Sequence, residues 1–105
     1  MREVVVGIDL GATWVRAALA DAGGRILLRR AERTEGDGRS IGEQLPRMVR
    51  GLLSEGDLVL KAIGVGSIGP LDLRRGRVIN PPNLPVGEIP LLDILQAEFD
   101  VPVYV

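Results

Sequence analysis

The sequence predicts a single α/β domain built on a five-stranded mixed sheet, in which three antiparallel strands are followed by two parallel ones. Three observations predict this fold. Three apolar stretches within the first 32 residues are separated only by short turns, as in consecutive antiparallel strands. A helical pattern then precedes a fourth apolar stretch, and such a helical crossover between strands suits a mixed α/β sheet. A second helical pattern precedes the last apolar stretch, at residues 101–105.

The first three strands are expected over residues 3–9, 13–20 and 25–32. Three consecutive valines make the first strand apolar on both faces, which is typical of a central, buried strand. The second and third strands flank an Asp-Ala-Gly-Gly hairpin turn at residues 21–24. Charged residues from Arg29 to Glu35 indicate that the third strand lies at a solvent-exposed edge.

The first helix follows a loop at residues 36–39. Ser40 and Glu43 have the spacing of a capping box, and apolar residues then recur at helical spacing as far as Leu53. Pro46 favours a later start, near Gln44, because a proline inside a helix removes a hydrogen bond and clashes with the preceding turn. The sequence therefore predicts the helix and leaves its first residue open.

The remaining elements are a strand over residues 58–65, a short extended piece at residues 78–79, an irregular Asn-Pro-rich loop over 80–85, a helix over 90–99 and a strand over 101–105. Pro90 is expected at the first helical position, where its missing N–H has no cost. Because a buried-looking strand is an unusual natural terminus, we expect the chain to be one N-terminal lobe, truncated at Val105, of a longer two-lobed protein.

Composition narrows the functional classes. Thirteen basic and 14 acidic residues give a net charge of −1, so neither nucleic acid nor an anionic membrane is an expected partner. The chain has no Cys and no His, which excludes disulfides, imidazole bases and zinc sites made from these ligands within it. With no signal-peptide pattern and no apolar run of transmembrane length, a cytoplasmic protein is expected.

The turn between the first two strands carries Asp9, Gly11 and Thr13. Gly11 can adopt positive φ and lets a ligand approach the backbone, while successive N–H groups and the Thr13 hydroxyl can form an anion site. Asp9 would repel phosphate, so we expect it to hold a hydrated Mg²⁺. A phosphate-and-metal turn is therefore one interpretation. An ordinary polar hairpin is an equal alternative on spacing alone, because Asp and Gly are common turn residues.

A second candidate segment is rich in glycine and lies at the end of the fourth strand, at residues 64–70. Ligands of α/β proteins bind at such strand ends, and the Ser67 hydroxyl with free backbone groups would suit a polar, uncharged ligand such as a sugar. Asn83, in a proline-framed loop, could donate to and accept from hydroxyl groups. A plain turn is the commoner explanation of such glycines and prolines.

Both segments resemble those of one family. Residues 9–16 (Asp-Leu-Gly-Ala-Thr-Trp-Val-Arg) resemble the first phosphate motif of sugar kinases in the superfamily of actin, hexokinase and heat-shock ATPases, with the ROK family (repressors, open reading frames and kinases) as the nearest match. Members usually have Gly in place of Ala12 and Lys or Asn in place of Trp14. Residues 66–72, 76–80 and 83–85 are similar to the sugar-side segment of ROK glucokinases and fructokinases.

The resemblance covers essentially the whole chain and about the first third of a family member. It implies a ribonuclease-H-like N-terminal lobe of an ATP-dependent sugar kinase, a glucokinase or broad hexokinase. In such a lobe the nucleotide and Mg²⁺ would be held at Asp9, Gly11, Ala12 and Thr13, with Arg16 as a phosphate-binding or structural cation. The hexose would be faced by Ser67, Gly69, Pro70 and Asn83.

The general base of the family is an Asp that follows the strand matching residues 101–105, so no catalytic residue is expected within this chain, which should be inactive alone. The intact protein is expected to use ATP and Mg²⁺, to act on a hexose and to form a homo-oligomer. Two alternatives stay open. One is an ATPase switch of the superfamily. The other is a sugar-responsive ROK regulator lacking its DNA-binding domain; such a domain would precede the first strand, and we expect none because that strand starts at about residue 3.

Overall fold

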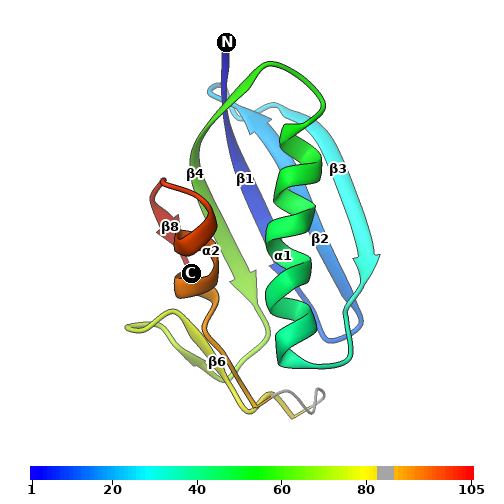
Figure 1. Cartoon of the computed structure of the whole chain (residues 1–105), viewed down its shortest axis with the longest axis vertical. Coiled ribbons are helices and arrows are strands. Elements are labelled where there is room, and N and C mark those ends of the chain that lie inside the picture. The colour runs from blue at the N-terminus through cyan, green and yellow to red at the C-terminus, as the bar shows by residue number, and fades with distance from the viewer. Residues whose placement is uncertain (83–86) are drawn as a thin grey trace.

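The computed structural model describes residues 1–82 and 87–105, and its main sheet has five strands in the order β3-β2-β1-β4-β8 (Figure 1). The strands are β1 (Arg2–Leu10), β2 (Trp14–Asp21), β3 (Ile26–Arg33), β4 (Leu58–Ser67) and β8 (Val103–Tyr104). β2 is antiparallel to β1 and β3, whereas β4 is parallel to β1 and β8 is parallel to β4. The predicted mixed sheet of three antiparallel and two parallel strands is confirmed.

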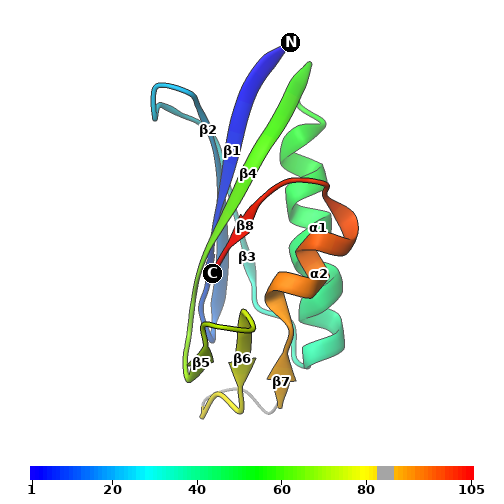
Figure 2. The same ribbon diagram turned by 90° about the vertical axis from the view of Figure 1, so that its left-hand side faces the viewer.

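Two helices, α1 (Gly38–Leu53) and α2 (Leu91–Glu98), pack on the same face of this sheet (Figure 2). Side chains of β1 therefore alternate: Val4 and Val6 are buried under the helices, whereas Val5 is 39% exposed on the opposite face. β1 lies at the centre of the sheet, as predicted, but it is buried on one face only. Within the described residues nothing covers the second face of β1, and three valines in a row cannot by themselves distinguish one buried face from two.

The first helix begins earlier than predicted. Asp37 is its N-cap, and the Asp37 carboxylate accepts hydrogen bonds from the Ser40 N–H (2.8 Å) and hydroxyl (3.1 Å). Ser40 thus lies inside the helix, so the predicted capping box does not form, and the start that the sequence left open lies before Ser40 and Gln44. Pro46 lies in the helix interior, on its buried face. Packing of the neighbouring apolar residues against the sheet compensates for the hydrogen bond that the proline removes.

A small antiparallel sheet, with strands β5 (Leu71–Asp72), β6 (Arg77–Ile79) and β7 (Glu88–Ile89), precedes α2. The sequence predicted only a short extended piece here, because strands of two or three residues show no period. Pro90 is the N-cap of α2 rather than its first helical residue, a difference of one position. No helix in the described part of the chain is both long and apolar enough to cross a membrane.

Candidate functional site

The two candidate segments lie side by side in the structure. β1 and β4 are parallel and end together, so that Asp9 is paired with Gly66 and Leu10 with Ser67. Beyond the strands, the Ile68 N–H donates to the Leu10 carbonyl (2.9 Å) and joins the two connections directly. The polar turn and the glycine-rich segment therefore share the carboxyl edge of the sheet, where open α/β folds bind ligands.

The β1–β2 turn, residues 11–13, presents free hydrogen-bond donors. The Gly11 N–H donates to the Trp14 carbonyl (3.0 Å), and two groups of Thr34 donate to the turn: the hydroxyl to the Gly11 carbonyl (2.8 Å) and the N–H to the Thr13 carbonyl (2.9 Å). Within the described residues, the N–H groups of Ala12 and Thr13 and the Thr13 hydroxyl donate to no protein acceptor. Three neighbouring donors without a partner are what an anion-binding turn requires.

The residue types in the turn follow from its geometry. A Cβ atom on Gly11 would lie 2.9 Å from the Trp14 carbonyl oxygen, so glycine is required by close approach of the backbone and not by positive φ, which Gly11 does not adopt. Ala12 has negative φ, and alanine therefore fits where the family usually has glycine. Trp14 is 40% exposed, and the Arg33 guanidinium lies 5.5 Å from its ring centroid, within cation–π range.

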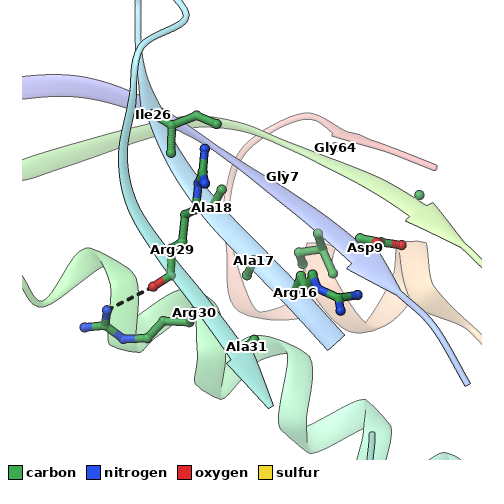
Figure 3. Close-up of a pocket in the computed structure, with 12 residues that line it drawn as sticks. Gly7, Asp9, Arg16, Ala17, Ala18, Ile26, Arg29, Arg30, Ala31 and Gly64 are labelled. Carbon is green, nitrogen blue, oxygen red and sulfur yellow. Dashed lines mark hydrogen bonds between the residues drawn. The ribbon is translucent and has the colours of Figure 1, made fainter. Parts of the chain in front are cut away.

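Asp9 and Arg16 are directly opposite each other on β1 and β2, and both are exposed on the uncovered face of the sheet. Neither forms an ion pair within 4.0 Å in the described part of the chain. Both line an open pocket of about 930 Å³, at whose other end Figure 3 shows Ile26 and Arg29. Asp9 is therefore free to interact with a ligand at the turn.

No group of three or more potential metal-ligating side chains occurs in residues 1–82 and 87–105. A single free carboxylate beside unpaired N–H donors fits Mg²⁺, which commonly keeps several waters and is bound by one or two carboxylates together with substrate phosphates. It does not fit a cation held by protein ligands alone. The donor set thus suits a metal that arrives with a phosphorylated ligand.

The predicted sugar-side residues lie next to the turn where they are described. Ser67 ends β4 and is partly buried, and its hydroxyl donates to the Ile68 carbonyl (3.1 Å). Gly69 and Pro70 follow, joined by a cis peptide bond, and the Pro70 carbonyl accepts from the Ile79 N–H (2.8 Å). Asn83 lies outside the described residues. Ser67 therefore lies beside the last residue before the turn, with Gly69 and Pro70 following in the chain, and contact of all three with a sugar stays a prediction.

Sequence reasoning missed two residues that support the turn. Thr34 contacts it directly, and Gln44 of α1 is the one buried polar residue in the described part of the chain, at 2% exposure. Thr34 gave no signal because it lies in the charged run that was interpreted as an edge strand. Gln44 could have been found from the sequence, because an amide on the buried face of an amphipathic helix requires internal hydrogen-bond partners.

Comparisons with known protein sequences find relatives of this chain. A sequence model described as the ROK family matches residues 5–105. A glucokinase of Pyrobaculum calidifontis is 44% identical over 100 residues, which cover 95% of this chain and 30% of that protein. A xylose repressor of Caldicellulosiruptor bescii is 29% identical over 114 residues, which cover 96% of this chain and 27% of the repressor. The chain thus spans less than a third of the length of these relatives.

Solved structures agree as well. The ROK hexokinase from Thermus thermophilus superposes with a TM-score of 0.83 at 37% identity, over 96% of this chain and 34% of that one. A ROK glucokinase from Streptomyces griseus, in complex with glucose and AMPPNP, has a TM-score of 0.83 at 29% identity, over 97% of this chain and 32% of that one. The predicted fold, a ribonuclease-H-like lobe of the actin-like ATPases, is confirmed.

Proposed function

The chain belongs to the ROK family, and from this premise we propose that it is the N-terminal lobe of an ATP-dependent hexose kinase, a glucokinase or broad hexokinase. The observation that carries the proposal is the β1–β2 turn, with its three unpaired donors beside the unpaired carboxylate of Asp9. The 44% identity to a glucokinase favours sugar phosphorylation over other ROK activities. The location in the cytoplasm and a homo-oligomeric assembly stay predictions.

In this proposal the turn binds the transferred end of ATP. The N–H groups of Ala12 and Thr13 and the Thr13 hydroxyl donate to phosphate oxygens, and Arg16 adds positive charge beside them. Mg²⁺, when bound, would be held by Asp9 through water and would neutralise charge on the phosphates. Gly69, Pro70, Asn83 and Ser67 face the hexose. A carboxylate outside these 105 residues accepts the hydroxyl proton, so this chain alone is expected to be inactive.

A second candidate is a sugar-responsive regulator, which the 29% identity to a xylose repressor supports. Such a protein would bind its sugar without transferring phosphate. A third is an ATPase switch, which would hydrolyse ATP at a rate that does not depend on sugar. These candidates differ in one measurable quantity, the sugar-dependent consumption of ATP.

The test is a coupled phosphorylation assay on the full-length gene product with glucose, other hexoses and ATP-Mg²⁺. We expect sugar-dependent turnover that Asp9→Ala abolishes without lowering the melting temperature. Asp57→Ala, at the opposite end of the sheet beside the start of β4, is the matched control and should retain activity. Sugar binding without turnover would support the regulator, and sugar-independent ATP hydrolysis would support the switch.

A further inference from the structure

Gln44 fixes the backbone on both sides of Thr34. From α1 its Nε2 donates to the Arg33 carbonyl (2.8 Å) and to Glu32 Oε1 (3.2 Å), and its Oε1 accepts from the Glu35 N–H (3.1 Å). A buried amide left without partners is costly, so these bonds hold the segment that leaves β3 in one position. That segment contains Thr34 and connects β3 to the N-cap of α1.

Thr34 in turn fixes two peptide groups of the β1–β2 turn. Its hydroxyl binds the Gly11 carbonyl and its N–H binds the Thr13 carbonyl. The Gly11 carbonyl and the Ala12 N–H belong to one planar trans peptide and point in opposite directions. Holding the carbonyl toward Thr34 therefore directs the Ala12 N–H away from it. The peptide that carries the Thr13 N–H lies between the two that Thr34 holds.

We propose that Thr34 and Gln44 are positioning residues that keep the Ala12 and Thr13 N–H groups turned toward the phosphates, an inference that rests on the proposed kinase function. Without the Thr34 hydroxyl, the Gly11–Ala12 peptide can rotate and present a carbonyl oxygen to the nucleotide. That oxygen would repel the phosphates that the N–H attracts. Donors that are fixed before the reaction lower its barrier, whereas donors that must reorient do not.

The kinetic test compares Thr34→Val, which keeps the shape and loses the hydroxyl, with Thr34→Ser, which keeps it, in the full-length gene product. We expect Thr34→Val to lower kcat/KM for ATP by about 10- to 100-fold, with KM for the sugar unchanged, and Thr34→Ser to restore most of it. Ser54→Ala is the matched control, because it removes a hydroxyl-to-carbonyl bond of 2.8 Å to Gly51 at the far end of α1. It should leave both kinetic constants unchanged.

The second test, by NMR, does not depend on enzymatic activity. In amide NMR spectra of the 105-residue chain, Thr34→Val should broaden or double the signals of Ala12 and Thr13, while the core amides of Val49 and Ile63 keep their positions. Gln44→Met, which leaves the Glu35 N–H and Arg33 carbonyl unpaired, should produce the same pattern. Thr34→Ser should give single, sharp signals as in the wild type.

The outcomes separate the two proposals. If Thr34→Val lowers only the melting temperature, and leaves both the Ala12 and Thr13 signals and kcat/KM for ATP as in the wild type, positioning by Thr34 is refuted. A rise in KM for the sugar as large as the rise in KM for ATP would also refute it, since it indicates general damage to both binding sites. If the wild-type protein phosphorylates no sugar, the kinase proposal fails, while the NMR arm still decides whether Thr34 orders the turn.

Discussion

The Trp14 carbonyl oxygen lies 2.9 Å from the position that a Cβ atom on Gly11 would occupy, and the same oxygen accepts the Gly11 N–H at 3.0 Å. Both atoms belong to backbone, so neither can move aside cheaply. We expect Gly11→Ala to open the turn, to destabilise the chain by about 1–3 kcal/mol and to raise KM for ATP in the full-length protein.

Thermal unfolding and steady-state kinetics check this prediction. Ala12→Gly is the matched control, because Ala12 has negative φ and glycine adopts the same conformation. Ala12→Gly should lower the free energy of unfolding by less than about 1 kcal/mol, because its only effect is the conformational entropy that glycine adds to the unfolded chain. A Gly11→Ala protein with the wild-type melting temperature and KM would show that the turn adapts and that close approach is not the reason for glycine.

The sequence predicted the strand directions of the sheet because these depend on strong signals. Short turns between apolar stretches require antiparallel neighbours, and a helix before the next strand allows a parallel one. The parallel pairing of β1 with β4 then brings Asp9 and Gly66 together. Residues 57 positions apart in the chain meet at one edge of the sheet, and topology alone accounts for this.

What the sequence could not predict depends on tertiary contacts. The helix start was missed because Asp37 and Ser40 are both good N-caps, and only the geometry selects Asp37. Pro46 suggested a later start, since the packing energy that keeps a helix continuous through proline has no local signal. The hydrogen bonds from Thr34 to the Gly11 and Thr13 carbonyls join residues 21–23 positions apart. No periodic pattern in a sequence predicts a side-chain hydrogen bond to a distant carbonyl.

Gly64 has no structural reason to be glycine within this chain. It lies in β4 with no positive φ, and a Cβ atom added there meets nothing within 4 Å. Glycine inside a strand costs about 0.5–1 kcal/mol relative to alanine. In urea unfolding of the 105-residue chain, we therefore expect Gly64→Ala to raise the free energy of unfolding by about this amount. A loss of stability would mean that something occupies the uncovered face.

Gly76 gives the opposite expectation for the same substitution. It has φ +65° in the β5–β6 turn, and a Cβ atom there would lie 2.5 Å from the Leu92 Cβ of α2. Gly76→Ala combines a left-handed backbone with a clash against a helix, and we expect it to lower the free energy of unfolding by more than about 1 kcal/mol. Leu92→Ala does not relieve that clash, because it keeps the Cβ. The double variant should therefore be no more stable than Gly76→Ala.

The hydrogen bonds of the Glu32 carboxylate make the stability of the fold depend on pH. Arg47 of α1 donates two hydrogen bonds to its carboxylate, at 2.7 and 2.9 Å, and Gln44 donates a third. The bonds from Arg47, and secondarily the one from Gln44, hold the pKa of Glu32 below its usual 4.5 in the folded chain. A lowered folded pKa means that the ionised side chain stabilises the fold above pH 4.5, and that this contribution disappears as the pH falls from 4.5 through the lowered pKa.

Glu32→Gln should therefore lower the urea midpoint at neutral pH and have a much smaller effect at a pH well below 4.5, where the wild-type carboxyl is also protonated. Glu43→Gln in α1 is the matched control, because the contact of Glu43 with Arg39 spans 3.7 Å and both side chains are largely exposed. Such pairs contribute little to stability, so its midpoint should follow the wild type across the whole pH range. If Glu32→Gln lowered the urea midpoint equally at both pH values, the charge of Glu32 would not be what stabilises the contact between β3 and α1.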